Sequence, residues 1–267
     1  MHRDTPMSKG KKTATVEFLG TGTSTGVPIP GCSCRVCRSG DWHDKRHRSS
    51  VLIRHGSLNL IIDTTPEFRI QCLRAGVMSL HAVLYTHDHA DHMNGIDDVR
   101  CFSFFKDKSL PVWGSAETLG ALRRRFDYIW NAVQIGGGLP EITLHEVDGP
   151  FGVIGLEVTP IPIKHGRLDI LGYRIGGFAY MTDVSAIPES SLPLLENLDT
   201  MVISCVRRRP HHTHLNIAGA KRLHNLVRPR RTLLTHLTHY LSHKELIAAF
   251  PVDITPAYDG MKIVIPL

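Results

Sequence analysis

The sequence predicts an α/β protein with a single domain that extends from residue 15 to residue 267. The length of 267 residues fits one large α/β domain or two small ones, and the chain contains no internal repeat and no long linker. Short apolar segments typical of strands recur along the chain, together with segments whose apolar residues have helical spacing. Hydrophobic residues make up 42% of the chain and charged residues 21%, which excludes a disordered or collagen-like protein.

The first half of the chain contains four predicted strands. They cover residues 16–19, 50–53, 58–62 and 82–85. The turn sequence His55-Gly56-Ser57 separates the second strand from the third, which predicts a β-hairpin. Ser115 is a suitable N-cap, and apolar residues at helical spacing follow it, so we expect a helix over residues 116–130.

The second half repeats this organisation. Strands are predicted over residues 156–163, 173–181, 200–206, 231–234 and 262–265. Asn216 can cap a helix that continues to residue 227, and the capping box of Ser242 and Glu245 begins a short helix that ends near Phe250. Several strands in both halves are followed by His or Asp. Strand ends are rigid and open onto loops, so polar groups there are both fixed and accessible.

Charge and segment composition limit the classes of partner. The formal net charge is +6, and half of the excess lies in residues 1–14, which we expect to form a basic, disordered tail. The remainder is compatible with an anionic substrate but is not typical of a dedicated DNA-binding protein. No run approaches the roughly 20 apolar residues that span a bilayer, and no apolar stretch follows the basic N-terminus. We therefore expect a cytoplasmic protein without a membrane partner.

The most specific motif is Thr86-His87-Asp88-His89-Ala90-Asp91-His92. Three imidazoles and carboxylates beside an apolar strand are costly to bury unless something satisfies them, and a metal does so. A tight loop can direct His87 and His89 to one side and Asp91 and His92 to the other. The spacing therefore predicts four ligands that are divided between two adjacent cations.

Three further residues follow apolar strands: His165, Asp183 and His236. A single His after a strand is more often structural than a ligand. Three such positions, taken together with the His87–His92 motif, can complete two metal sites.

These residues resemble the metallo-β-lactamase fold hydrolases, whose H-x-H-x-D-H signature is followed by separate His, Asp and His residues. The resemblance covers the chain from about Thr15 onward and implies a four-layer αβ/βα sandwich. It implies one metal bound by His87, His89 and His165, a second bound by Asp91, His92 and His236, and Asp183 as the bridge between them. It also implies that Asp63 orients the motif from behind the ligands. Aspartate at position 183 resembles the binuclear phosphodiesterases and glyoxalase II-like enzymes, because the β-lactamases themselves carry Cys there.

A second cluster, Cys32, Cys34 and Cys37, has C-x-C-x2-C spacing. Three thiols can bind one tetrahedral zinc but leave its fourth position open, and inert reduced thiols are the alternative. His239 follows His236 by three residues, and this combination resembles a subgroup of the family, the phosphoribosyl 1,2-cyclic phosphate phosphodiesterases. The resemblance implies a structural zinc with four protein ligands, which leaves no position for catalysis and joins the N-terminal loop to the active-site loop.

A basic loop over residues 207–216 carries three histidines directly before a predicted helix. In the resembled phosphodiesterases and in tRNA 3′-processing endonucleases, a His at this place acts as general acid or contacts phosphate. His214 matches best, His212 is a weaker candidate for a phosphate contact, and His211 is weaker still. Surface histidines on a basic loop are the alternative. A protonated imidazole near the metals can supply the proton of the leaving group.

Arginines suggest further phosphate contacts. Arg46 and Arg48 precede a strand close to the Cys cluster, and we expect them to bind phosphate by bidentate contacts. The run 123–125 lies in a predicted helix, where a solvated face is expected. The Gly-rich loop 20–26 lacks the residues of a P-loop or of a dinucleotide-binding turn.

The sequence therefore predicts a hydrolase with two divalent metals, zinc or manganese, and one structural zinc. The favoured substrate is a small cyclic phosphate or nucleotide-like phosphodiester, with His214, Asp91 and Asp183 as the catalytic residues.

Two other functions share the metal ligands. A ribonuclease like the tRNA 3′-processing endonucleases needs an RNA-gripping insertion, but only 18 positions separate His165 from Asp183, so nucleic acid is the less favoured substrate. A glyoxalase II-like thioesterase would lack the Cys cluster. The oligomeric state is open, and a homodimer is one option.

Overall fold

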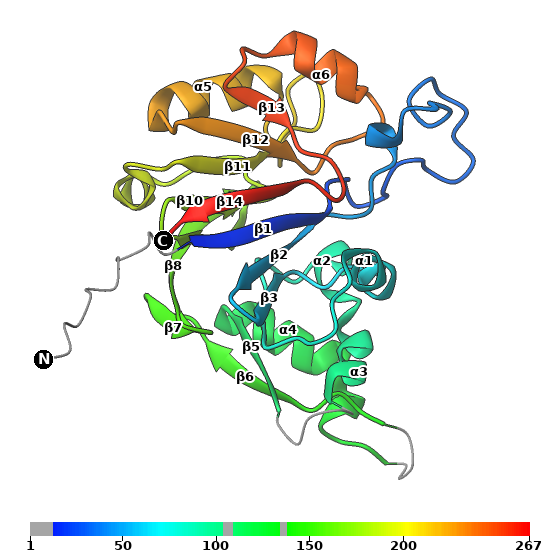
Figure 1. Cartoon of the computed structure of the whole chain (residues 1–267), viewed down its shortest axis with the longest axis vertical. Helices are drawn as coiled ribbons and strands as arrows, with labels where there is room; N and C mark the ends of the chain where they lie inside the picture. The colour runs from blue at the N-terminus through cyan, green and yellow to red at the C-terminus, as the bar shows by residue number, and fades with distance from the viewer. Residues whose placement is uncertain (1–12, 104–108, 134–137) are drawn as a thin grey trace, which may run out of the picture.

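The computed structural model describes residues 13–103, 109–133 and 138–267, and within them two seven-stranded sheets pack face to face (Figure 1). The first sheet has the strand order β14-β1-β2-β3-β4-β5-β6. Its strands are β1 (Thr13–Gly20), β2 (Ser50–His55), β3 (Leu58–Ile62), β4 (Ala82–Leu84), β5 (Leu110–Gly114), β6 (Ile142–Glu146) and β14 (Lys262–Pro266).

The second sheet has the order β13-β12-β11-β10-β9-β8-β7. Its strands are β7 (Phe151–Val153), β8 (Leu156–His165), β9 (Leu168–Ile175), β10 (Phe178–Met181), β11 (Thr200–Ser204), β12 (Arg231–Thr235) and β13 (Ile254–Pro256). Apolar residues from the inner faces of both sheets form one core, in which Phe18, Tyr173 and Tyr180 are fully buried.

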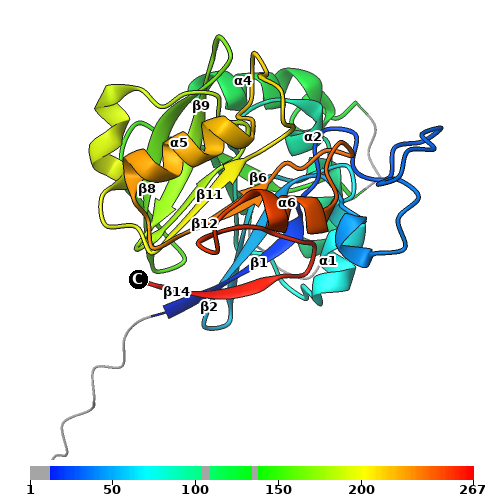
Figure 2. The same ribbon diagram turned by 90° about the horizontal axis from the view of Figure 1, so that it is seen from above.

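Helices cover the two outer faces of the sandwich. They are α1 (Phe68–Ala75), α2 (Ala90–Met93), α3 (Arg100–Ser103) and α4 (Ala116–Arg125) beside the first sheet, and α5 (Ile217–Val227) and α6 (His243–Ala249) beside the second (Figures 1 and 2). A separate apolar cluster lies between each sheet and its helices. The fold is thus the four-layer αβ/βα sandwich that the resemblance implied, and that prediction is confirmed.

Several local predictions are also confirmed. β2 and β3 form the expected antiparallel hairpin. Ser115 caps α4, Asn216 caps α5, and Ser242 and Glu245 form the capping box of α6. In each case a short polar side chain accepts a backbone N–H that the first helical turn leaves unpaired.

Other predicted boundaries are wrong. The segment 173–181 is not one strand: β9 and β10 pair antiparallel around the turn Gly176-Gly177. Gly176 has φ 54°, and a Cβ there would lie 2.4 Å from the Pro266 carbonyl oxygen, so only glycine fits. The helix expected over 116–130 ends at Arg125 and is followed by a short 3₁₀ turn, Asp127–Ile129.

The expected basic tail lies outside the described residues up to Lys12. Thr13 and Ala14, which we assigned to that tail, instead pair with Pro266 and Ile265 as the start of β1. The C-terminal strand β14 therefore lies beside the beginning of the described chain (Figure 1).

Strand direction brings the predicted site residues to one edge of the sandwich. β3 and β4 are parallel, and so are β10, β11 and β12, so that the carboxyl ends of neighbouring strands lie together. Asp63, Asp183 and His236 each follow one of these strands, and all three have positive φ, at 66°, 58° and 53°. Left-handed backbone at non-glycine residues is uncommon and concentrates at functional sites. No helix in the described part of the chain is long and apolar enough to cross a membrane.

Candidate metal centre

Three imidazoles form the first half of the site. His87 and His89 follow β4, and His165 is the last residue of β8. Their ligand atoms lie within 4.8 Å of one another, and the ring centroids of His87 and His89 are 4.6 Å apart. His165 donates its Nδ1 hydrogen to the Thr213 carbonyl oxygen at 2.7 Å, which leaves its Nε2 free to bind a metal.

The second half consists of Asp91, His92 and His236, whose ligand atoms also lie within 4.8 Å of one another. Asp183 lies between the halves. Its Oδ2 is 3.2 Å from His92 Nε2 and its Oδ1 is 3.2 Å from His236 Nε2, and it also groups with His87 of the first half. The carboxylate therefore has the position that a residue shared by two cations requires.

The donor set fits divalent cations. The Nε2 atom of His87 is buried and has no hydrogen-bond partner among the described residues, whereas those of His92 and His236 are buried facing Asp183. Burial opposes ionisation of Asp183, but His236 and His92 hold the pKa of this carboxyl well below its usual range. Burial lowers the pKa of His87, so this imidazole is neutral and able to donate a lone pair. Buried, unpartnered ring nitrogens beside ionised carboxylates are the ligands that zinc and manganese share.

Asp63 fixes the orientation of the motif from behind. The side chain is fully buried, and its carboxylate accepts hydrogen bonds of 2.8 Å from Thr86 N, Thr86 Oγ1 and His92 Nδ1. Because His92 donates through Nδ1, its Nε2 faces Asp91 and Asp183. Such outer partners set the tautomer and the direction of a ligating imidazole.

His214 lies beside the metal centre and belongs to the loop that leads into α5. Its Nδ1 is 3.6 Å from Asp183 Oδ1, and its ring stacks on His236 with a centroid distance of 4.8 Å. Burial, followed by His236, lowers the pKa of His214 to about 3, which favours the neutral imidazole. A bound phosphate anion would oppose this effect and favour the protonated form.

Of the other two histidines in this loop, the structure places His211 beside His214. The His211 ring lies 5.1 Å from the His214 ring, and burial together with Arg207 lowers the pKa of His211. The His211 and His212 side chains are both exposed, and His211 is the one whose ring contact with His214 the structure shows. His211 therefore lies nearer the reaction centre than His212, because the turn around Thr213 folds its ring back onto His214.

The four residues of the predicted zinc site lie together. The Sγ atoms of Cys32, Cys34 and Cys37 lie 3.3, 3.4 and 3.6 Å from Nδ1 of His239. Tetrahedral zinc with these ligands would hold sulfur and nitrogen roughly 3.5 Å apart. The backbone N–H of Cys37 lowers the pKa of Cys34 to about 6, which favours the thiolate that zinc binds. The site links the loop before β2, blue in Figure 1, to the loop after β12.

Cys34→Ser is expected to reduce stability more than catalysis. A structural metal contributes its binding energy to folding, so losing one ligand should lower the melting temperature by at least about 5 °C, while turnover per folded molecule changes less. Thermal unfolding and active-site titration measure the two effects. Cys101→Ser, at an exposed thiol outside the cluster, is the matched control. An unchanged melting temperature for Cys34→Ser would show that the thiols hold no zinc.

The proposed phosphate contact of Arg46 is wrong. Its side chain is fully buried, and its guanidinium donates to the carbonyl oxygens of His43, Thr238 and Leu241 and pairs with Asp44. No donor remains for a substrate. Arg46 instead holds the backbone on both sides of His239.

Arg48 remains partly exposed and pairs with Glu67, and it also donates to the Ser24 carbonyl oxygen. The structure therefore brings neither arginine of this pair into contact with the metal centre. The contact proposed for Arg48 stays a prediction.

Two positioning residues were not identified from the sequence. Ser49 Oγ accepts the backbone N–H of His236 and donates to Gly22 O, so the Gly-rich loop supports a metal-ligand candidate. Arg125 pairs with Asp88 at 2.9 Å and also donates to its carbonyl oxygen, which anchors the His87–His92 motif to α4. Arg125 therefore does not belong to the purely solvated face that we expected. Neither role could be predicted from local sequence, because Ser49 and Arg125 contact residues that are distant along the chain.

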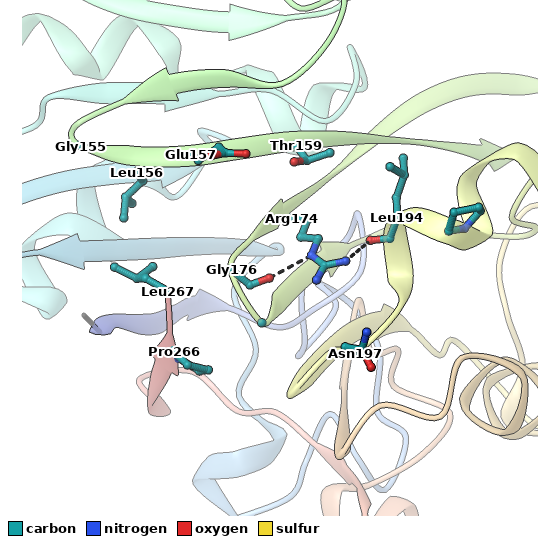
Figure 3. Close-up of a pocket in the computed structure, with 12 residues that line it drawn as sticks. Gly155, Leu156, Glu157, Thr159, Arg174, Gly176, Leu194, Asn197, Pro266 and Leu267 are labelled. Carbon is teal, nitrogen blue, oxygen red and sulfur yellow. Dashed lines mark hydrogen bonds between the residues drawn. The ribbon is translucent and has the colours of Figure 1, made fainter. Parts of the chain in front are cut away.

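A cavity of about 610 Å³ lies away from the metal centre (Figure 3). Gly155, Thr159, Asn197 and Leu267 contribute to its wall. Arg174 lines it too, but its guanidinium donates to the carbonyl oxygens of Gly176 and Leu194, as the dashed lines in Figure 3 show. None of the candidate metal ligands lines this cavity.

Comparison with known proteins agrees with this geometry. The model of the β-lactamase superfamily domain matches residues 58–237. The structure described as a new diphosphatase from the PhnP family is 37% identical, with a TM-score of 0.90, and the match covers 96% of this chain and 98% of that one. Human tRNase Z, short form, has a TM-score of 0.68 at 19% identity and covers 95% of this chain and all of its own, which shows a common fold.

A curated relative, the octanoyltransferase of Porphyromonas gingivalis, is 40% identical over 253 residues. The match covers 93% of this chain and 51% of the relative. The chain therefore spans about half the length of this curated relative.

Proposed function

The chain belongs to the PhnP family within the β-lactamase superfamily, a family of metal-dependent hydrolases, and we propose that it hydrolyses a small phosphodiester or diphosphate ester. The related structure described as a diphosphatase shares 37% of its sequence over nearly the whole chain, which supports a phosphate ester as the substrate.

We assign two divalent cations to the candidate centre. His87, His89 and His165 would hold one, Asp91, His92 and His236 would hold the other, and Asp183 would contact both. When bound, zinc or manganese ions supply Lewis-acid activation of water and neutralise charge on phosphoryl oxygens. A third cation, a structural zinc, is assigned to Cys32, Cys34, Cys37 and His239. Zinc binding by Cys32, Cys34 and Cys37 requires reduced thiols, which favours a reducing compartment such as the cytoplasm.

The observation that carries the proposal is the position of His214. Its imidazole lies 3.6 Å from Asp183 and beside His236, outside the two ligand sets assigned above. An alkoxide leaving group needs a proton as the P–O bond breaks, and an adjacent imidazolium can supply it. A thiolate leaves without one, because thiols ionise near neutral pH. A proton donor at this place therefore favours cleavage of a P–O–C bond over thioester hydrolysis, whereas cleavage of a diphosphate, which releases a phosphate, does not depend on it.

The other residues of the site orient the candidate metal ligands and fix the loops that carry them. Asp63 and Thr213 hold His92 and His165 in the tautomers that leave Nε2 free. Ser49 and Arg125 fix the two loops that carry His236 and the His87–His92 motif. Asp91 stays ionised because His92 and His236 overcome its burial and hold the pKa of its carboxyl well below its usual range.

Acyl-thioester hydrolysis is the second candidate. The name of the Porphyromonas gingivalis relative, octanoyltransferase, is the observation that favours it. Ribonuclease activity has less support, because only β9 and β10 with their short turns lie between His165 and Asp183, which leaves no RNA-binding arm there.

A substrate comparison tests the proposal. The protein loaded with zinc or manganese is assayed with bis-p-nitrophenyl phosphate, adenosine diphosphate ribose, octanoyl-coenzyme A and a precursor tRNA. We expect hydrolysis of the phosphate esters and little release of coenzyme A. Turnover of the thioester at a higher kcat/KM than either small phosphate ester would contradict the proposal, and so would preferred cleavage of the tRNA.

A further inference from the structure

A second cavity is lined in part by the loop that carries His214. Its volume is about 370 Å³, and it is lined by Arg207, Arg208, Arg209, Tyr240 and Leu241; we call it the arginine pocket. The arginines come from the loop that carries His214, and the other wall directly follows His239 of the Cys cluster. Thr238 Oγ1 donates to the Val206 carbonyl oxygen, which joins the two walls.

The positive charge of the arginine pocket is not balanced by an acidic side chain in the described part of the chain. Arg207, Arg208 and Arg209 form no ion pair with any residue that the structure describes, whereas Arg46 and Arg125 are both paired with aspartates. Arg207 donates from Nη2 to the Pro210 carbonyl oxygen, but its Nε is buried without a partner in the described chain. Three consecutive arginines without an ion-pair partner among the described residues favour an anion, and phosphate matches the donors of a guanidinium.

The opposite wall is suited to a planar ring. Tyr240 is 60% exposed although its ring packs on His239 at 4.6 Å, and Leu241 beside it is buried. Arg46 holds the Leu241 carbonyl oxygen, so this wall is anchored from behind. An exposed aromatic ring on an anchored loop offers a stacking surface for a base, and arginine planes stack on bases as well.

The pocket includes none of the candidate metal ligands, and the loop that carries His214 connects it to the metal centre. Four positions after Arg207 in the same loop, the His211 ring lies 5.1 Å from His214, which is 3.6 Å from Asp183. A volume of about 370 Å³ is at the small end of the range for ligand pockets, which suits a nucleoside-sized group rather than a polymer.

We propose that the arginine pocket binds the nucleotide half of a nucleoside diphosphate ester. The base stacks on Tyr240, and the arginines bind the phosphate that is not attacked. The other phosphate then reaches the candidate metal centre. This assignment rests on the proposed phosphate-ester hydrolysis and narrows it to nucleotide substrates.

The test compares two substrates that differ in the second phosphate and the base. In the double variant R208Q/R209Q, the ratio of kcat/KM for adenosine diphosphate ribose to that for bis-p-nitrophenyl phosphate should fall about tenfold to a hundredfold, the size of a lost charge-assisted contact. Tyr240→Leu should lower the same ratio, and Tyr240→Phe should preserve it, because phenylalanine retains the stacking face. Arg222→Gln, an exposed arginine of α5, is the matched charge control.

Calorimetric binding of adenosine diphosphate ribose separates this assignment from the proposed function. If the wild-type protein hydrolyses neither phosphate ester, the proposed function fails, but weaker binding of this nucleotide by R208Q/R209Q and Tyr240→Leu would still support the pocket. Equal losses on both substrates, unchanged binding in these variants, or tighter arginine-dependent binding of single-stranded RNA than of the nucleotide would each overturn the assignment.

Discussion

Asp183→Ala is expected to remove both metal occupancy of the catalytic centre and turnover. The two oxygens of Asp183 are 3.2 Å from Nε2 of His92 and of His236, which belong to one ligand set. Asp183 also groups with His87 and His165 of the other set, so one change removes a contact to both. The change also removes the negative charge of the carboxylate that lies between the imidazoles of the centre. We expect fewer than two bound metals per catalytic centre by elemental analysis and hydrolysis of bis-p-nitrophenyl phosphate at background level.

Two controls make this prediction specific. Asp183 has φ 58°, which alanine tolerates less well than aspartate, so Asp183→Asn should be measured beside it, because asparagine accepts this backbone. Asp169→Ala removes an exposed carboxylate that pairs with Lys164 and should leave metals and activity unchanged. A folded Asp183→Asn protein with two catalytic metals and substantial activity would show that the carboxylate is not the bridge.

His214→Ala should lower turnover without removing metals. The residue is outside the two ligand sets that we assign, and loss of a general acid costs about 10² to 10⁴ in rate. The loss should be greatest for a substrate with an alkoxide leaving group and smaller for bis-p-nitrophenyl phosphate, because p-nitrophenolate leaves without a proton. The measurements are kcat for the substrate with the alkoxide leaving group, kcat for bis-p-nitrophenyl phosphate, and the metal content of each variant.

Variants of the neighbouring histidines distinguish proton transfer from phosphate positioning as the role of His214. His212→Ala, at an exposed side chain, should have a small effect on both substrates. Equal impairment of His214→Ala on good and poor leaving groups would indicate phosphate positioning instead of proton transfer. A larger, leaving-group-dependent effect of His211→Ala would move the acid to the ring 5.1 Å from His214.

The elements that the sequence predicted correctly carry local signals. Strand ends marked by His or Asp, the helix caps at Ser115 and Asn216, and the β2–β3 hairpin depend on residues close in sequence. The grouping of the metal-ligand candidates followed from a family resemblance, and the structure brings these residues within 4.8 Å of one another in overlapping groups.

What was missed depends on contacts between distant segments. Arg46 looked like a phosphate ligand because it is basic and near the Cys cluster, yet burial against Thr238 and Leu241, almost 200 positions away, uses its donors. The break between β9 and β10 is an exception, because Gly176-Gly177 is a local signal for a two-residue hairpin turn that the prediction of one strand overlooked. The positive φ values of Asp63 and His236 were not predicted from the sequence either.

The most direct test of the account is a metal titration of activity. After mild chelation the protein should retain one zinc, held by the Cys cluster, and show no hydrolysis of bis-p-nitrophenyl phosphate. Added zinc or manganese should then restore activity with saturation at two further equivalents per chain. Full activity in the chelated protein, or saturation after a single equivalent, would contradict a catalytic centre with two metals.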